Sequence, residues 1–304
     1  AEQALRLQPI QKDVNFDLPE GDEIAQCTIK AEKVGDLVGW TVRDGIGQLA
    51  WALTGAVESL GGALHLSTRV RRLVRKHQHW EVVTRRGTVR APVVIANLLP
   101  QTVLELATVT NSDDVAGLRR LGRRVADGWG AVMWYLGIED HADLPETPHH
   151  VELIADTGAP FVAGNHIFCS LSGRDEERAP NGQRTVTVST HVDMQRLRAT
   201  DPAPLIDGIQ RRMRQTLAAL APEIDTAVVH ALPASPRTFA RFTGRHHGLV
   251  GGIPRRAGLD NYRGLLPTPS APGLHLVGDS TFPGQSTLAT ALGGLKTAQR
   301  VLAS

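Results

Sequence analysis

The segment from Gly273 to Leu288 constrains the fold more than any other part of the chain. It reads as an apolar strand that ends in Gly278-Asp279, followed by a Pro-Gly turn and by Ser286, which is a suitable helix N-cap. Apolar residues then recur at helical spacing, at Leu288, Ala291, Leu292, Leu295 and Leu302. Such a helix aims its free N–H groups beyond the end of the strand, where they favour an anion or an electron-rich ring edge.

A family resemblance rests on this segment. Val277 to Gln285, Val-Gly-Asp-Ser-Thr-Phe-Pro-Gly-Gln, resembles the C-terminal flavin-binding motif of the phytoene desaturase and carotenoid isomerase family of FAD-dependent oxidoreductases. Its form is most similar to the prolycopene isomerase branch. The resemblance extends to three further segments, Arg241–Gly252, Asp44–Ala50 and Val93–Pro100. It implies FAD as the cofactor.

The resemblance also implies roles for individual residues. Asp279 would accept hydrogen bonds from the ribityl hydroxyls, and N–H groups from Gly284 to Leu288 would face the electron-rich edge of the flavin. Val70 would hold the adenine edge through its backbone, although a core strand valine explains it equally well. The predicted cofactor-binding residues are Val70, Gly278, Asp279, Pro283, Gly284, Ser286, Thr287 and Leu288. No side chain receives a catalytic role.

A polar set lies upstream of the flavin motif, at Arg241, Arg245, His246 and His247. These residues could place a general acid or a cation over the ring, because histidine titrates near neutral pH. Solvated loop residues are the alternative interpretation. The two adjacent histidines lack carboxylates at ligand spacing, so no metal site is predicted.

A second glycine-rich segment, Gly45-Ile-Gly47-Gln-Leu-Ala50, fits a dinucleotide-binding pattern between a predicted strand and a helix. An NAD site needs an acidic residue about 20 positions further on, where this chain has Ser67-Thr68-Arg69. An arginine there suits a 2′-phosphate, which keeps an NADP-binding reductase open. The family placement instead puts the turn beside flavin and substrate, and a turn that simply begins a helix is a third interpretation.

The Gly-x-Gly-x-x-Gly segment that binds the ADP half of FAD in the family does not occur in the sequence. The chain also begins at Ala1 rather than Met. We therefore expect a partial chain, completed by an N-terminal half or a companion subunit. A subunit that has lost FAD binding is the alternative.

Composition places the 304-residue chain among ordinary globular proteins, with 41% hydrophobic and 21% charged residues. A net charge of +2 gives no case for nucleic acid as a partner. Two cysteines, Cys27 and Cys169, provide neither a disulfide framework nor a zinc site. We expect a cytoplasmic location, with peripheral membrane contact as a way to reach an apolar substrate.

The expected fold class is α/β with mixed α+β character: a partial Rossmann-like FAD-binding domain with an inserted mixed-sheet substrate domain. Residues 1–38 form an irregular N-terminal segment, residues 39–100 and 236–304 the discontinuous and incomplete FAD-binding domain, and residues 101–235 the substrate domain. Helices are predicted over 48–60, 113–124 and 204–220. Strands are predicted over 37–42, 63–75, 80–85, 88–97, 131–138, 151–155, 161–170 and 184–191.

The expected function is that of an FAD-dependent oxidoreductase acting on a long apolar polyene, by desaturation, saturation or isomerisation. The flavin carries the chemistry in such enzymes, and the protein positions the substrate and excludes water. A flavin amine oxidase-like enzyme is an alternative, since related amine oxidases share the cofactor architecture. The low aromatic content of 4% argues against an aromatic amine-binding cage.

Overall fold

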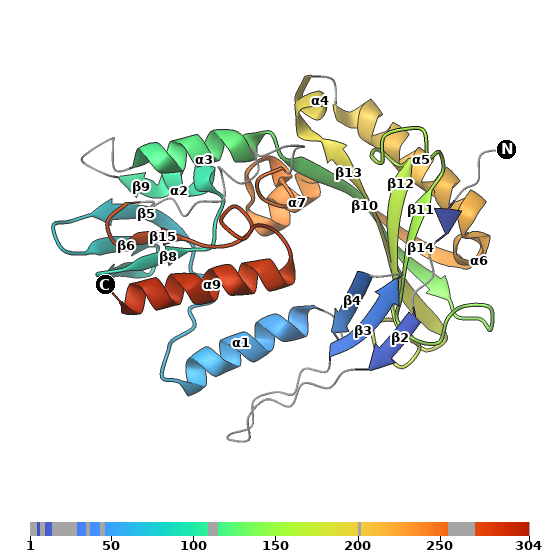
Figure 1. Cartoon of the computed structure of the whole chain (residues 1–304), viewed down its shortest axis with the longest axis horizontal. Coiled ribbons are helices and arrows are strands. Elements are labelled where there is room, and N and C mark those ends of the chain that lie inside the picture. Colours follow the sequence, from blue (N-terminus) through green and yellow to red (C-terminus); the bar gives the residue numbers. More distant parts are fainter. Residues whose placement is uncertain are drawn as a thin grey trace. The chain divides into compact units, whose positions relative to one another are not determined.

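The computed structural model describes residues 5–6, 10–13, 29–34, 37–42, 46–108, 115–199, 202–254 and 271–303. The chain divides into two compact units (Figure 1). The first, called the sheet unit, comprises residues 1–66, 132–192 and 201–234. The second, called the motif unit, comprises residues 67–131, 193–200 and 235–304.

A six-stranded sheet in the order β1-β11-β12-β13-β10-β14 forms the centre of the sheet unit. Its strands are β1 (Leu5–Arg6), β10 (Trp129–Glu139), β11 (His149–Ile154), β12 (His166–Leu171), β13 (Gln183–Asp193) and β14 (Val228–Ala234). The pairs β1–β11, β11–β12, β12–β13 and β10–β14 are antiparallel. Helix α5 (Pro202–Leu220) contacts β11 and β12.

Alternation along the strands produces the core of this unit, because successive strand residues point to opposite faces. The side chains buried along these strands are mostly apolar, among them Leu136, Ile138, Val151, Leu153, Ile167, Cys169, Leu171, Val186 and Val188. Helix α5 contributes Ile206, Ile209, Met213 and Leu217, which recur at helical spacing and are also buried. The helix and the sheet thus cover each other's apolar surface.

Smaller elements complete the sheet unit. An antiparallel three-stranded sheet contains β2 (Ile10–Asp13), β3 (Ile29–Val34) and β4 (Leu37–Val42). Helix α1 (Gly47–Ser59) contains no buried residue, and Trp51, Leu53 and Val57 on it are exposed. The short helix α6 (Pro222–Asp225) follows α5.

The motif unit holds two sheets. One has the order β7-β6-β5-β9 and the other is the parallel pair β15-β8. The strands are β5 (Val70–Arg75), β6 (Trp80–Thr84), β7 (Gly87–Ala91), β8 (Val94–Ala96), β9 (Ala107–Thr108) and β15 (Leu274–Leu276). The helices are α2 (Pro100–Leu106), α3 (Ala116–Ala126), α4 (Met194–Ala199), α7 (Pro236–Thr243), the 3₁₀ turn η2 (His246–Gly248) and α9 (Thr287–Leu302).

Trp80 links the two sheets of the motif unit. Its side chain is fully buried, and its indole Nε1 donates a hydrogen bond to the carbonyl oxygen of Pro272 at 3.0 Å. Pro272 lies just before β15, while Trp80 begins β6. A buried tryptophan needs such an acceptor, and here the bond fixes the start of the strand that leads to the flavin motif.

The mixed α/β fold class predicted from the sequence is confirmed. The predicted strand over 88–97 is instead two strands, β7 and β8, separated at Pro92, which has no N–H for a ladder. The sequence did not predict α2, α7 or the strands within residues 1–34. The compact units also have other boundaries than the predicted domains, since residues 46–66 join the sheet unit and 101–131 join the motif unit.

Candidate functional site

Segment 277–288, which contains the predicted flavin-binding motif, begins at the carboxyl end of a parallel strand pair. β15 pairs with β8 in the register Leu274↔Val94 and Leu276↔Ala96. The N–H of Val277 then donates to the carbonyl oxygen of Ala96 at 3.0 Å, so the pairing extends to the first residue of the motif. Ligands of open α/β sheets bind beyond the carboxyl ends of their strands, and this is where the chain turns.

The turn after β15 depends on glycine. Gly278 has a φ of 106°, and a Cβ there would lie 2.6 Å from Oδ1 of Asn97. Its carbonyl oxygen accepts hydrogen bonds from both the N–H and the hydroxyl of Thr281, at 3.2 and 2.9 Å. The N–H of Gly284 closes the turn on the carbonyl oxygen of Thr281 at 2.7 Å. Gly278 therefore allows the backbone to make this turn, because only glycine adopts this conformation freely.

Helix α9 follows directly, as Figure 1 shows, and Ser286 caps it as predicted. The hydroxyl of Ser286 accepts from the N–H of Ala289 at 3.1 Å, and its carbonyl oxygen accepts from the N–H of Thr290 at 3.0 Å. Within the described ranges, no hydrogen-bond acceptor is recorded for the N–H groups of Thr287 and Leu288. Those two first-turn donors, together with the helix dipole, suit an electron-rich ligand edge.

The upstream glycine-rich segment meets this turn in space. A Cβ at Gly252 would lie 1.7 Å from the carbonyl oxygen of Asp279, and one at Gly251 would lie 2.0 Å from Oε1 of Gln285. Leu249 between them and η2 is fully buried. Segments 241–252 and 277–288, both part of the family resemblance, therefore form one closely packed structure.

Arg245 joins these segments through its guanidinium group. Its Nη2 donates to Oδ2 of Asp279 at 2.9 Å and to the carbonyl oxygen of Gly251 at 2.8 Å. Its Nε donates to the carbonyl oxygen of Leu249 at 2.6 Å. Arg245 is thus bonded within the protein, whereas the sequence suggested a cation facing the ring or a solvated residue. Sequence reasoning missed this role because the partner lies 34 residues away.

Asp279 is half-buried and retains capacity for further hydrogen bonds. Besides Arg245 on Oδ2, it accepts a bond of 3.3 Å from the Ser280 hydroxyl on Oδ1. An ionised carboxylate offers about four acceptor positions. The side chain can therefore accept hydroxyl donors from a ligand while it stays anchored to Arg245.

The histidines of the polar set have partners of their own. Nε2 of His246 lies 3.3 Å from Oε1 of Glu105, and the His246 and His247 rings are in edge-to-face contact. The pKa of His247 is lowered mainly by burial, and further by the positive charges of His246 and Arg198. The carboxylate of Glu105 acts in the opposite direction. The guanidinium of Arg241 stacks over the exposed ring of Phe242 at 5.3 Å. These contacts give no sign of a general acid directed at the turn.

Comparison with known proteins places the chain in a family. The family model for flavin containing amine oxidoreductases matches residues 20–302. The chain belongs to this family. Its flavin-containing character agrees with the FAD predicted from the sequence.

Curated relatives agree with the predicted branch. The chain is 30% identical over 179 residues to a chloroplastic prolycopene isomerase of Arabidopsis thaliana, a match that covers 56% of this chain and 29% of the relative. It is 30% identical over 182 residues to the chloroplastic prolycopene isomerase of Daucus carota, a match that covers 56% of this chain and 28% of the relative. The chain thus matches less than a third of the length of these curated relatives.

Solved structures of low sequence identity share the fold. An oxidoreductase from Methanosarcina mazei gives a TM-score of 0.59 at 15% identity, covering 86% of this chain and 55% of that one. A redesigned putrescine oxidase gives 0.56 at 13% identity, covering 87% and 54%. A putative protoporphyrinogen oxidase from Exiguobacterium sp. 255-15 gives 0.54 at 13% identity, covering 86% and 52%.

The remaining predicted residues lie elsewhere. Val70 is half-buried at the start of β5, pairs with Thr84, and is followed by a register shift before Arg72. Its contact with an adenine edge stays a prediction. Gly45 lies outside the described residues, and Gly47 begins α1 in the sheet unit. The role of that turn in this flavin family likewise stays a prediction.

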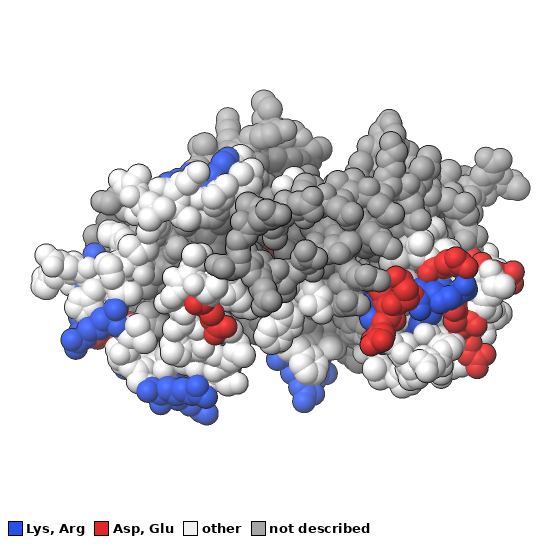
Figure 2. Space-filling model, turned by 90° about the horizontal axis from the view of Figure 1, so that it is seen from below, with Lys and Arg blue, Asp and Glu red and all other residues white. Residues whose placement is uncertain are grey.

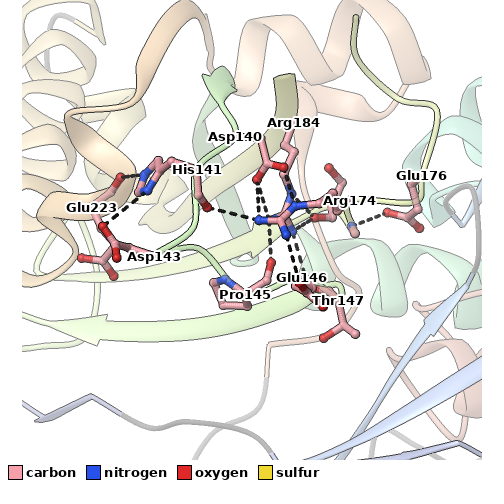
Figure 3. A network of polar contacts seen from close by, with 12 residues as sticks. Asp140, His141, Asp143, Pro145, Glu146, Thr147, Arg174, Glu176, Arg184 and Glu223 are labelled. Atoms are coloured by element: carbon pink, nitrogen blue, oxygen red, sulfur yellow. Dashed lines mark hydrogen bonds and ion pairs between the residues drawn. The ribbon is translucent and has the colours of Figure 1, made fainter. Parts of the chain in front are cut away.

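A second polar cluster lies in the sheet unit around Arg184 (Figure 3). This buried guanidinium donates to the carbonyl oxygens of Ser172, Pro145 and Thr147, and its Nη1 lies 3.5 Å from Oδ1 of Asp140. Arg174 contacts Asp140 and Glu146 as well, with Nε 2.5 Å from Oδ2 of Asp140. Because the arginine groups bind loop carbonyls and neighbouring carboxylates, the cluster holds loops together rather than offering a ligand site.

Among the described residues, neither the charged surface of Figure 2 nor any group of possible metal ligands indicates a further site. Figure 2 shows both acidic and basic side chains among the described residues of the face that it draws. In the described parts of the chain, no group of three or more His, Cys, Asp or Glu could hold a metal ion. No helix among those residues is long and apolar enough to cross a bilayer. Cys169 is buried, and burial raises the pKa of its thiol to about 12.

Proposed function

We propose that this chain supplies the ribityl and ring-edge side of the FAD site in an FAD-dependent oxidoreductase that acts on a long apolar polyene. One observation carries the proposal. Asp279 and the first-turn N–H groups of α9 emerge together from the carboxyl end of β15, in a chain of a flavin-containing family. The donor and acceptor set fits a flavin, whose ribityl chain offers hydroxyl donors and whose ring carries electron-rich edges.

The protein's part in the reaction is to bind and orient. Asp279 accepts hydrogen bonds from ribityl hydroxyls while Arg245 anchors it. The N–H groups of Thr287 and Leu288 face the ring edge, where they stabilise negative charge with the helix dipole. Gly284 offers close approach, since nothing lies within 4 Å of a Cβ placed there. When bound, the flavin supplies the electron transfer, as in other flavoenzymes.

The substrate proposal draws on the prolycopene isomerases, whose names specify isomerisation of a polyene. The putrescine oxidase likeness, at 13% identity, bears on the fold alone. Whether the reaction is isomerisation, desaturation or saturation depends on the redox state of the flavin and the shape of the pocket. A polyene as the substrate class is the common element of all three.

We propose that the ADP half of FAD binds to a strand-helix-strand segment outside the described residues. This segment would belong either to a longer form of this chain or to a companion subunit. Two features support this. The leucines of α9 at 288, 292, 295 and 302 are exposed. The parallel pair β15-β8 has only two strands among the described residues, whereas parallel sheets are normally larger and covered on both faces.

Flavin titration of the purified chain tests the proposal. We expect the flavin absorption band to persist after desalting with FAD, and Asp279→Ala to weaken flavin binding by about tenfold or more, since hydrogen bonds to a charged group contribute about 1.5–3 kcal/mol. Asp143→Ala, at an exposed carboxylate of the sheet unit, is the control and should leave binding unchanged. A chain that stays colourless with FAD, even with an added ADP-binding half, would refute the proposal.

The substrate class is tested by anaerobic mixing of the flavin complex with a polyene and with aliphatic amines. We expect the flavin spectrum or the polyene geometry to change with the polyene only. Reduction by amines alone would instead select the amine oxidase-like alternative.

A further inference from the structure

We propose that Arg245 is a positioning residue for the flavin: it fixes the Asp279 carboxylate so that this carboxylate meets the ribityl hydroxyls. The inference rests on the proposed flavin site. It assigns Arg245 a role that the sequence did not suggest, because the guanidinium reaches Asp279 through the protein rather than facing the ring.

The three bonds of Arg245 explain why it positions rather than merely pairs. Its Nη2 reaches both Oδ2 of Asp279 and the carbonyl oxygen of Gly251, while its Nε holds the carbonyl oxygen of Leu249. A planar guanidinium has fixed donor directions. With two backbone acceptors holding the group, the third bond directs one carboxylate oxygen of Asp279 to a defined place.

The anchored carboxylate is left with its other oxygen for a ligand. Oδ1 accepts only a long bond of 3.3 Å from the adjacent Ser280 hydroxyl. Both partners of the ion pair are half-buried, with 28% and 21% of the Arg245 and Asp279 side chains exposed. Screening by water is therefore weaker than at an open surface, and a misdirected Asp279 would lose contact with the ribityl chain.

The backbone around the pair makes it rigid. Gly252 touches the backbone of Asp279 closely enough to exclude any side chain, and Gly248 has a φ of 70° with Pro236 immediately against it. Helix α7, which precedes the 244–252 loop, is capped at its start, where the N–H of Ser235 donates to the Thr238 hydroxyl at 3.1 Å. Arg245 thus transmits the fixed geometry of the 244–252 loop to the side chain of Asp279.

Two flavins that differ only in the ribityl chain separate positioning from general support. Riboflavin carries the chain, and lumiflavin has a methyl group instead. In titrations of the full chain followed by flavin fluorescence, Arg245→Gln should weaken riboflavin binding by roughly tenfold and change lumiflavin binding by less than about twofold. Adding Asp279→Asn to Arg245→Gln should cause little further loss, because the two residues act as one unit.

Control variants decide between the outcomes. Arg241→Gln, at an arginine of the preceding helix α7 that stacks on Phe242, should bind both flavins as the original chain does. Arg245→Lys keeps a charge near Asp279 but not the fixed fork, so we expect an intermediate loss for riboflavin alone. It replaces Arg245→Gln if circular dichroism shows that the latter does not fold.

Equal losses for riboflavin and lumiflavin, or additive losses in the double variant, would overturn the positioning role while leaving the flavin site intact. Unchanged riboflavin binding in both Arg245 variants would do the same. If the original chain binds neither flavin, and also binds no FAD when an ADP-binding half is added, the proposed function fails, and this inference fails with it.

Discussion

Helices α5 and α9 both carry apolar residues at helical spacing in the sequence, but these residues are buried in α5 and exposed in α9. The stripe of α5 at Ile206, Ile209, Met213 and Leu217 is buried, with Met213 fully enclosed. In α9, Leu288, Leu295 and Leu302 are 81%, 57% and 87% exposed. The periodicity therefore predicted both helices but not what covers them.

The two helices lie next to sheets of different size: α5 contacts the six-stranded sheet, and α9 follows β15 of the two-stranded pair. Six strands offer α5 a continuous apolar face. The parallel pair β15-β8 has two short strands, and the described residues of α9 that are buried are Gly293 and Thr297. A complete core thus distinguishes the sheet unit, whereas the motif unit presents an apolar helix beside the flavin turn.

The largest expected effect is a loss of stability in the sheet unit. Met213→Ala leaves a cavity in a packed core and should lower the free energy of unfolding by about 2–5 kcal/mol. Leu295→Ala on α9 should change it by less than about 0.5 kcal/mol, as for other exposed sites. Urea unfolding followed by circular dichroism measures both. Equal losses would show that the α9 stripe is covered as well as that of α5.

The next effect tests the packing of the motif unit. Gly252→Ala sets a methyl group against the backbone of Asp279, at 1.7 Å from its carbonyl oxygen. Overpacking of this kind costs about 1–3 kcal/mol or more, and we expect the thermal midpoint and riboflavin affinity to fall together. Unchanged riboflavin affinity would separate the glycine loop from the flavin site.

Acid stability distinguishes the charged loops of the sheet unit. A hydrogen bond and the charge of Arg174, together with Arg184, hold the pKa of Asp140 below its usual value, against the opposing effect of burial. The unfolded chain therefore binds the proton more readily, so this stabilisation is present above an unfolded pKa of about 3.9 and is lost as pH falls through the folded value. Arg174→Gln should destabilise the chain at neutral pH.

Urea unfolding between pH 7 and pH 2 checks this prediction. The difference between the original chain and Arg174→Gln should narrow as Asp140 becomes protonated in both states. A difference independent of pH over that range would mean that Arg174 stabilises the loops through packing or backbone contacts, such as its bond to the carbonyl oxygen of His141.

The smallest effect is a stabilisation in α9. Gly294 lies inside the helix, and nothing is within 4 Å of a Cβ placed there. Gly294→Ala should raise the free energy of unfolding by about 0.5–1 kcal/mol, because alanine has the higher helix propensity. It is the matched control for Gly252→Ala in the same unit. A destabilised Gly294→Ala chain would show that this helix face is closely covered.

Local signals predicted much of the fold. Apolar spacing located α5, and Ser286 located the start of α9 to the residue. Helix α2 was not predicted, although Pro100 stands at its first position, where proline is favoured. Helix α7 was not predicted, although Ser235, Pro236 and Thr238 form a helix start signal.

The candidate site was predicted in part. The strand, turn and capped helix lie where the sequence put them, because each depends on neighbouring residues. The Arg245–Asp279 contact and the approach of Gly252 to Asp279 were not predicted, since they join segments about 30 residues apart. Pairing across such a distance depends on the path of the intervening chain, which no short pattern specifies.

The sequence by itself determined the family, the cofactor class and the strand–turn–helix that carries the flavin motif, because these depend on local residue types and spacing. The tertiary structure decided that Arg245 anchors Asp279 and that Arg184 binds loops. It also decided that, among the described residues, the apolar side chains of α5 are buried while the leucines of α9 are exposed. Burial and partner choice are properties of surfaces brought together by folding, and apolar residues at helical spacing are compatible with either outcome.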